Sequence, residues 1–347
     1  MMDTEDVLLR RDSGLGRIVL NRPKAINALT HAMVQQIDVA LGEWAAEDEV
    51  RAVLITGVGE RGLCAGGDIR SIHADSVSGN RASLAFWRDE YLLNHHIANY
   101  AKPYVAIMDG IVMGGGVGVS AHGSVRVVTE RTKLAMPEVG IGFVPDVGGT
   151  YLLSRAPGEL GTHLGLTASV ATGADAIHCG LADHFVPSGR LPAFLESLAL
   201  KGPEQAVAEH AVDAPASELA EQREWIDACY SADTVEEILS RLHELGEPAA
   251  KEAAESISGK SPTALKVTLR SLRQARALPG LGAVLDQEYR VSTACLDSAD
   301  LVEGIRAQVV DKDRDPKWAP STLEQVTDVD RYFAVLGAAE LGLGEQR

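Results

Sequence analysis

Short apolar runs alternate with amphipathic stretches through the first 190 residues of the chain. Four of these runs are rich in Val, Ile or Leu and have the length of strands. They are Arg17–Leu20, Arg51–Thr56, Tyr104–Met108 and Val125–Thr129. The stretches between them have helical periodicity, so the pattern predicts an α/β fold with parallel or mixed sheets.

Two of the intervening stretches predict long helices. The first is expected to begin at a Thr30 cap and to end near Ala46, because apolar residues recur after Thr30 at helical spacing. These apolar residues are Met33, Ile37 and Leu41. The second helix is predicted over Arg81–Tyr100.

The chain changes character after the apolar run His184–Val186. Ala, Glu, Leu and Arg dominate from Leu191 to about Glu340, and this composition is typical of helices. Helices are predicted at 203–210, 216–230, 234–244, 248–257, 262–276, 281–296 and 299–309. The sequence therefore predicts an α/β core over residues 1–190 and a helical C-terminal region over residues 191–347, with the boundary near Pro187–Pro192.

The charge balance limits the partners of the protein. Acidic residues number 49 and basic residues 32, which gives a formal net charge of -17. Such a field repels polyanions, so nucleic acid is not an expected partner. An anionic ligand would need a local site of backbone N–H groups and a few Lys or Arg side chains.

Cysteine usage and the apolar runs predict a soluble cytoplasmic protein. The four cysteines are widely spaced and form no CxxC pair, so reduced thiols are expected, and neither disulfides nor a zinc site. The acidic segment Met1–Arg11 does not resemble a secretory signal. Apolar runs are shorter than the roughly 18 residues that a membrane span needs, so no membrane contact is expected.

Glycine is concentrated in four short segments where bulkier residues would be expected. Two of them follow predicted strands and precede helical stretches, which places free N–H groups at a helix start. The segments are Cys64–Arg70, Met113–Gly118, Met136–Gly140 and Val144–Gly149. Each run alone is compatible with a tight strand-to-helix turn. Together with nearby carboxylates they suggest an oxyanion hole, in which two backbone donors polarise one carbonyl.

A dinucleotide site is the first alternative for Met113–Gly118. The G-x-G-x-x-G fingerprint would run through Gly114 and Gly116, but its third glycine is replaced by the bulkier Val119. The fingerprint is therefore broken. The sequence also has no P-loop, HExxH or GxSxG motif.

Two carboxylates stand beside these glycine segments. Glu138 follows Pro137, and Asp146 follows Pro145 eight residues later. Each carboxylate alone could simply cap the start of a helix. Because both recur beside glycine-rich elements, we interpret them as an active-site pair.

Three segments of the chain resemble the crotonase (enoyl-CoA hydratase/isomerase) superfamily. Cys64–Arg70 is similar to its CoA-binding and oxyanion loop, Asn21–Leu29 to its N-terminal signature, and Met113–Gly118 to its second oxyanion loop. Within the superfamily the chain most resembles the 3-hydroxyisobutyryl-CoA hydrolases. The segments that carry this finer likeness are Glu90–Asn94, Ala135–Glu138, Ile141–Gly149, Ser261–Lys266, Glu288–Arg290, Glu303–Arg306, Asp311–Asp313 and Pro316–Trp318.

The resemblance implies a fold of repeated ββα turns, followed by a helical region that relatives use in self-association. A homo-oligomer is therefore a possible state of this chain. It also implies that the enzyme needs no separate cofactor, because coenzyme A is part of the acyl-CoA substrate. One departure matters: enoyl-CoA hydratases carry a glutamate where this chain has Gly118. Since glycine cannot transfer a proton, the departure favours the hydrolase branch.

The resemblance also implies roles for single residues. The amides of Gly67 and Gly115 would bind the thioester oxygen, and Glu138 would act as nucleophile or general base. Asp146 would bind the substrate 3-hydroxyl or position water, and Glu90 would line the acyl site. The residues implied in CoA binding are Arg22, Lys24, Ala25, Ile26, Ala65, Gly67, Asp68, Ile69 and Arg70. The cations among them could equally be solvated surface residues, and no metal ligands are expected.

Three functions remain open from the sequence. The first is hydrolysis of a 3-hydroxyacyl-CoA, with 3-hydroxyisobutyryl-CoA of valine catabolism as the substrate. The second is hydration or isomerisation of another acyl-CoA on the same scaffold, and the third is a non-catalytic CoA-binding protein. Cys64 is predicted to be a buried thiol and not a nucleophile. His95 and His96 are interpreted as packing residues.

Overall fold

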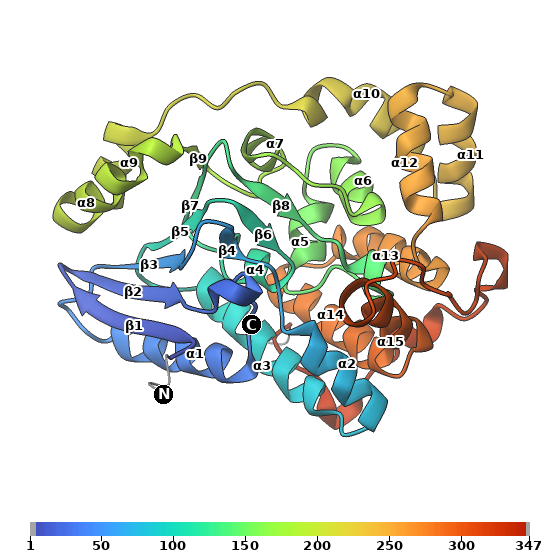
Figure 1. The fold of residues 1–347 in the computed structure, drawn as a ribbon, viewed down its shortest axis with the longest axis horizontal. Helices are drawn as coiled ribbons and strands as arrows, with labels where there is room; N and C mark the ends of the chain where they lie inside the picture. The colour runs from blue at the N-terminus through green and yellow to red at the C-terminus, as the bar shows by residue number, and fades with distance from the viewer. Residues whose placement is uncertain (1–4, 345–347) are drawn as a thin grey trace. The chain divides into compact units, whose positions relative to one another are not determined.

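The computed structural model describes residues 5–344 and divides into two compact units, each built from several segments of the chain. The first unit comprises Met1–Gly67, Asp89–Ala135 and Val170–Ala220, and the second comprises Asp68–Arg88, Met136–Ser169 and Glu221–Arg347. Figure 1 shows the elements along the chain.

The strands of the first unit form two sheets (Figure 1). A six-stranded sheet has the order β1-β2-β3-β5-β7-β9, and a three-stranded sheet has the order β4-β6-β8. Only the β1–β2 pair is antiparallel, and the other pairs are parallel. The strands are β1 (Val7–Asp12), β2 (Leu15–Leu20), β3 (Ala52–Gly57), β4 (Gly62–Cys64), β5 (Tyr104–Met108), β6 (Ile111–Met113), β7 (Val125–Val128), β8 (Lys133–Ala135) and β9 (His184–Phe185).

Successive strand pairs divide between the two sheets. After the β1–β2 pair, β3, β5 and β7 join the large sheet, and β4, β6 and β8, which follow them along the chain, join the small one. Helices follow these pairs: α1 (His31–Ala45), α2 (Ile69–Ser78) with α3 (Ala82–Ala98), α4 (Gly115–Gly118) and α5 (Gly149–Ser154). The expected succession of ββα turns is therefore confirmed.

Apolar residues explain why these segments form strands and helices. All five residues of β5 are buried, as expected for a strand with both faces covered. Helix α1 begins at Thr30, whose side chain accepts a hydrogen bond from the Met33 amide at 3.3 Å. Its apolar stripe, which includes Ile37 and Leu41, is buried.

After β7 the first unit adds three helices, and the last two of them pack against the large sheet. They are α7 (Gly173–His178), α8 (Leu191–Lys201) and α9 (Pro203–His210). Phe194 and Leu198 of α8 pack into one core cluster with strand residues such as Val105 and Val127. This burial fixes the large sheet, whereas the glycine loops Cys64–Arg70 and Met113–Gly118 follow β4 and β6 of the small sheet.

The second unit is helical. Its centre is α13 (Pro262–Ala275), most of whose side chains are buried, and α13 packs on α5, α6 and α14. Ser261 caps α13 by accepting a hydrogen bond from the Ala264 amide at 3.1 Å, and Pro262 occupies the first helical position. The other helices are α6 (Leu160–Thr167), α10 (Glu218–Tyr230), α11 (Val235–Leu245), α12 (Pro248–Ser258), α14 (Leu281–Leu296) and α15 (Ala299–Ile305).

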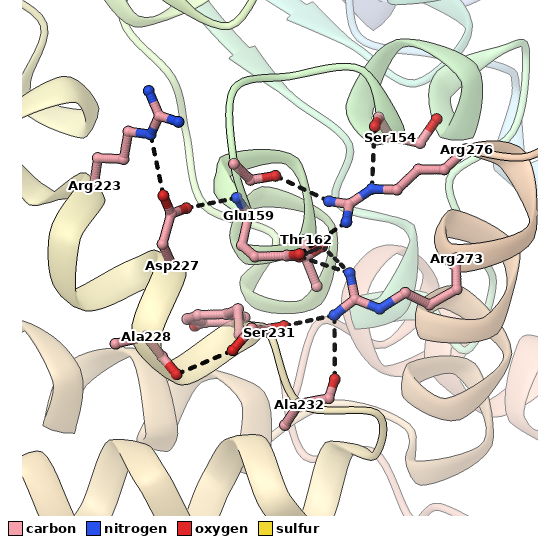
Figure 2. Close-up of polar contacts among 12 residues, drawn as sticks. Ser154, Glu159, Thr162, Arg223, Asp227, Ala228, Ser231, Ala232, Arg273 and Arg276 are labelled. Atoms are coloured by element: carbon pink, nitrogen blue, oxygen red, sulfur yellow. Dashed lines mark hydrogen bonds and ion pairs between the residues drawn. The ribbon is translucent and has the colours of Figure 1, made fainter.

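A buried carboxylate network supports this helical unit (Figure 2). Glu159 accepts hydrogen bonds from Arg273 at 2.7 Å, from Arg276 at 2.8 Å and from Thr162 at 2.6 Å. Burial alone would raise the pKa of Glu159, but the three donors lower it below its ordinary value. The network therefore holds an ionised carboxylate between α6 and α13.

Most of the predicted elements are confirmed, and the predicted helices from 203 onward agree with the structure to within a few residues. The predicted 299–309 helix contains a π-helical turn over Arg306–Val310. The strands β1, β4, β6 and β8 and the helices α2, α6, α7 and α8 were not predicted. The 1–190 and 191–347 division stays a prediction. Between residues 5 and 344, no helix is both long and apolar enough to span a bilayer.

Candidate active site

Two glycine amides lie side by side in the first unit. Helix α4 begins at Gly115, directly after Gly114, whose φ of 48° and ψ of -120° favour glycine. The Gly115 N–H lies in the first helical turn, so it has no intrahelical acceptor. Gly67 forms a parallel bridge with Leu29 shortly after β4. Among the described residues, no oxygen accepts a hydrogen bond from either amide.

Built Cβ atoms measure how close these two loops are. A Cβ added to Gly115 would lie 3.3 Å from the Gly67 nitrogen, and one added to Gly66 would lie 3.7 Å from the Gly115 nitrogen. A side chain at position 115 would therefore occupy the space beside both amides. The structure brings the two predicted oxyanion residues together.

Glu90 lies at the same place. It is buried on α3, and its Oε1 would be 2.6 Å from a Cβ on Gly115. Glycine at position 115 thus leaves room for this carboxyl group. Glu90, which was predicted to line the acyl site, therefore lies beside Gly115, one of the predicted oxyanion residues.

Hydrogen bonds from backbone and side chain join the N-terminal signature loop (Asn21–Leu29) to β4 and its flanking loops. Leu29 donates its N–H to the Gly66 carbonyl at 2.8 Å, and Ala65 donates to the Ile26 carbonyl at 2.9 Å. The fully buried Asn27 donates to the carbonyls of Val58 and Leu63, each at 3.1 Å. This role of Asn27 is not predictable from the sequence, because neither its left-handed φ of 55° nor its burial is evident there.

The predicted CoA-binding residues of the first unit differ in their surroundings. Lys24 and Ala25 are exposed on the 3-10 helix Pro23–Ala25, and Ile26 follows in the left-handed region. Arg22 is half-buried, and its guanidinium donates to the Ala28 carbonyl at 2.6 Å. It therefore supports the loop and is not a freely solvated cation. Ala65 is half-buried at the end of β4.

The remaining predicted CoA-binding residues belong to the second unit. Asp68 stands at the N-cap of α2, and Ile69 and Arg70 form its first turn. Arg70 is exposed and donates to the Val309 carbonyl at 2.7 Å. Their role toward CoA stays a prediction.

Glu138 begins the 3-10 helix η2 (Glu138–Ile141) of the second unit, and its side chain is buried. Glycines let η2 approach α15 closely, since a Cβ on Gly142 or on Gly304 would overlap the backbone of the facing element. The Phe143 amide also donates to the Glu138 carbonyl at 3.0 Å. The backbone that carries Glu138 is therefore fixed.

Asp146 begins a tight turn in the same unit and is buried. The Gly149 amide donates to the Asp146 carbonyl at 2.6 Å, which closes the turn. Val147 has a φ of 52° and Gly148 a φ of 78°, so both central residues are left-handed, as in a type I′ turn. Such a conformation costs a β-branched residue about 1–3 kcal/mol.

Glu288, a fully buried acid on α14, accepts hydrogen bonds from this turn. Its Oε2 accepts from the Gly148 amide at 2.6 Å, and its Oε1 accepts from the Thr150 amide at 2.9 Å and the Thr150 hydroxyl at 2.5 Å. Burial raises the pKa of Glu288 to about 8, the Thr150 and Gly148 donors oppose the rise, and the Asp146 charge adds to it. No role was predicted for Glu288 from the sequence.

Cys64 is predicted to be unreactive in the folded protein. Burial raises the pKa of its thiol to about 12, so almost no thiolate exists at pH 8. Iodoacetamide at pH 8 should leave Cys64 unmodified and the activity unchanged, as measured by peptide mass spectrometry and thioester turnover. Rapid alkylation of Cys64 in folded protein would contradict this prediction.

The histidines do not form a site of their own. His96 is held within the first unit by a 2.7 Å hydrogen bond between its Nδ1 and Asp38. Across residues 5–344, no group of three or more His, Cys, Asp or Glu side chains is arranged to hold a metal ion.

Comparison with known proteins gives one family. A model described as enoyl-CoA hydratase/isomerase matches residues 15–333. The mitochondrial 3-hydroxyisobutyryl-CoA hydrolase of Gallus gallus is 43% identical, over 97% of this chain and 91% of that protein. The Homo sapiens protein of the same name is also 43% identical, over 97% of this chain and 90% of its own length.

Two solved structures share the whole fold but are described by other activities. A carnitinyl-CoA dehydratase from Mycobacterium thermoresistibile is 57% identical, with a TM-score of 0.95 over 97% of this chain and 98% of that one. An enoyl-CoA hydratase from Rhodobacter sphaeroides is 43% identical, with a TM-score of 0.92 over 97% and 99%. The crotonase-type α/β fold with its helical C-terminal region is thereby confirmed.

Proposed function

The chain belongs to the enoyl-CoA hydratase/isomerase family, and from this premise we propose that it hydrolyses a 3-hydroxyacyl-CoA thioester, with 3-hydroxyisobutyryl-CoA as the preferred substrate. The products would be 3-hydroxyisobutyrate and free coenzyme A. This reaction would place the enzyme in valine catabolism. Similarity over nearly the whole length to the Gallus gallus and Homo sapiens hydrolases supports the proposal.

The observation that carries the choice of reaction is the residue at the end of α4. Gly118 is buried there, where the resemblance places a glutamate of the hydratases. Hydration of a double bond needs proton transfer from two carboxylates around one water, and a glycine supplies none. A hydrolase needs only a polarised carbonyl and one carboxylate that attacks it or activates water.

The proposed mechanism begins with the two adjacent amides. The thioester oxygen accepts hydrogen bonds from the N–H groups of Gly67 and Gly115, which stabilise the negative charge that develops when the carbonyl carbon is attacked. The Glu138 carboxylate either attacks that carbon directly, which gives a mixed anhydride, or removes a proton from an attacking water. The carbon–sulfur bond breaks as the anhydride or the free acid forms, and the sulfur leaves as thiolate and takes up a proton. On the nucleophilic route, water then hydrolyses the anhydride, which releases the acid and regenerates the Glu138 carboxylate. In the net reaction one water is consumed.

The acyl group would be selected by carboxylates. Asp146 accepts a hydrogen bond from the substrate 3-hydroxyl or orients water, and Glu90 lines the acyl site beside Gly115. An acyl chain without the hydroxyl would leave a buried polar group without its partner, which lowers its rate of turnover. Buried positions of Asp146 and Glu90 support this assignment.

The nucleotide of CoA would lie along the signature loop and the loop after β4. Backbone groups of Ala25, Ile26 and Ala65, and of Asp68 and Ile69, would receive it. Lys24 and Arg70 are exposed cations available for its phosphates. Arg22 is half-buried and instead stabilises the signature loop through its hydrogen bond to the Ala28 carbonyl.

Hydration or dehydration of an acyl-CoA is the second candidate. It is favoured by the 57% identical structure described as a carnitinyl-CoA dehydratase. A cytoplasmic location and self-association stay predictions. The names of the Gallus gallus and Homo sapiens relatives place those two proteins in mitochondria.

One assay separates the candidates. Purified enzyme should release thiol rapidly from 3-hydroxyisobutyryl-CoA, as measured with a thiol reagent, and should remove the conjugated absorbance of crotonyl-CoA only slowly. Fast loss of that absorbance without thiol release would establish the second candidate. CoA binding without either activity would instead indicate a non-catalytic binding protein.

A further inference from the structure

We propose that Glu288 is a positioning residue that fixes the Asp146 carboxylate for recognition of the substrate 3-hydroxyl. The proposal rests on the proposed function, because it takes Asp146 as the acceptor for that hydroxyl. It assigns specificity to a residue 142 positions from Asp146 in sequence.

The turn that carries Asp146 needs an external support. Val147 and Gly148 are both left-handed, and a β-branched side chain at Val147 disfavours that backbone. A turn of this kind persists only when surrounding contacts determine it. The turn's own hydrogen bond joins Asp146 and Gly149, and Glu288 adds hydrogen bonds to the backbone at Gly148 and Thr150.

Glu288 supplies that support at two points. One carboxylate oxygen accepts from the Gly148 amide, and the other accepts from the amide and hydroxyl of Thr150. The two oxygens therefore fix both Gly148, the second left-handed residue of the turn, and the first turn of α5. Only a carboxyl group presents acceptors on both sides, since an amide in its place has one oxygen and would face one backbone N–H with its own NH₂.

Stability alone does not explain an acid here. Glu288 is close enough to Asp146 for the two charges to oppose each other, and no Lys or Arg among the described residues pairs with Glu288. Another buried acid of this unit, Glu159, is held by two arginines (Figure 2). A buried acid beside a second acid is costly unless its hydrogen bonds serve a purpose. The purpose indicated by the geometry is to orient Asp146.

The test compares Glu288→Gln with Glu159→Gln as a matched control, since both changes replace one carboxyl oxygen of a buried, multiply bonded glutamate with an NH₂ group. Thiol release is measured from 3-hydroxyisobutyryl-CoA and from isobutyryl-CoA, which lacks the hydroxyl, together with melting temperature. Glu288→Gln should lower kcat/KM for the hydroxylated substrate by about 10- to 100-fold. The rate on isobutyryl-CoA should change much less, so that the preference between the two shrinks. Inhibition by free CoA should be unchanged.

Glu159→Gln should lower the melting temperature and keep the preference between the substrates. If Glu288→Gln behaves in the same way, the residue is merely structural and the proposal is overturned. Should Glu288→Gln not fold, Thr150→Val removes one of its three donors, and the same reduced preference is expected in milder form. An unchanged preference in that variant would equally overturn the proposal.

Failure of the proposed function has a separate signature. In that case the wild-type enzyme itself releases no thiol from 3-hydroxyisobutyryl-CoA. The crystal structure of Glu288→Gln then decides the positioning role. A changed φ at Val147 and a displaced Asp146 are expected, and a turn identical to the wild type would refute it.

Discussion

Glu138→Gln is expected to abolish most thiol release from 3-hydroxyisobutyryl-CoA, with kcat reduced by about 10²–10⁴-fold. Glutamine keeps the size and the hydrogen-bonding reach of the side chain, but it can neither attack the carbonyl carbon nor accept a proton from water. Because Glu138 lies on a backbone fixed by close contact between η2 and α15, the variant should fold normally. Stopped assays of thiol release and the melting temperature measure the two effects.

A matched control is Glu224→Gln, which makes the same chemical change at an exposed position of α10. Its kcat should equal that of the wild type. The role of Glu138 is refuted if the Glu138→Gln variant retains more than about a tenth of wild-type kcat, since loss of a catalytic acid or base costs at least about 10²-fold.

Gly115→Ala is expected to cost about 10²–10³-fold in kcat, the typical effect of losing one oxyanion donor. The added methyl group would lie 3.3 Å from the Gly67 nitrogen and 2.6 Å from Glu90 Oε1. It would therefore displace the carbonyl oxygen from the two amides and push Glu90 aside. Alanine fits the helical backbone of α4, so the loss should appear in kcat and not in the amount of folded enzyme.

Gly42→Ala provides the control for an added methyl group in a helix. Position 42 lies inside α1 with no atom within 4 Å of the built Cβ. This variant should keep full activity and gain about 0.5–1 kcal/mol in the free energy of unfolding. A Gly115→Ala enzyme with wild-type kcat would show that the methyl group and the reacting carbonyl do not compete for space.

The fold was predictable where the pattern is long. The Thr30 cap and the apolar spacing after it predict α1 to within about one residue, and the helices predicted from 203 onward agree with the structure to within a few residues. Strands β4, β6 and β8 have three residues each, too few for any periodicity, and they exist through pairing across the chain. Helix α8 begins at Leu191 and has Pro192 in its first turn. Pro187 and Pro192 favoured a domain boundary there instead of a helix.

The candidate site was predictable where a motif is local. The glycine loops, Glu138 and Asp146 stand in short recognisable segments. Glu288 begins a recognised segment, but its role could not be predicted, because its partners Gly148 and Thr150 lie about 140 residues earlier. Asn27 is part of a recognised segment, but its role depends on carbonyls of β4 and the loop before it, which the sequence does not place nearby.

The most direct test of the account is a crystal structure of the Glu138→Gln enzyme with 3-hydroxyisobutyryl-CoA bound. The thioester oxygen should lie about 2.7–3.1 Å from the amide nitrogens of both Gly67 and Gly115, with residue 138 facing the carbonyl carbon. A thioester oxygen bound by other groups, or a side chain at 138 directed away from that carbon, would contradict it.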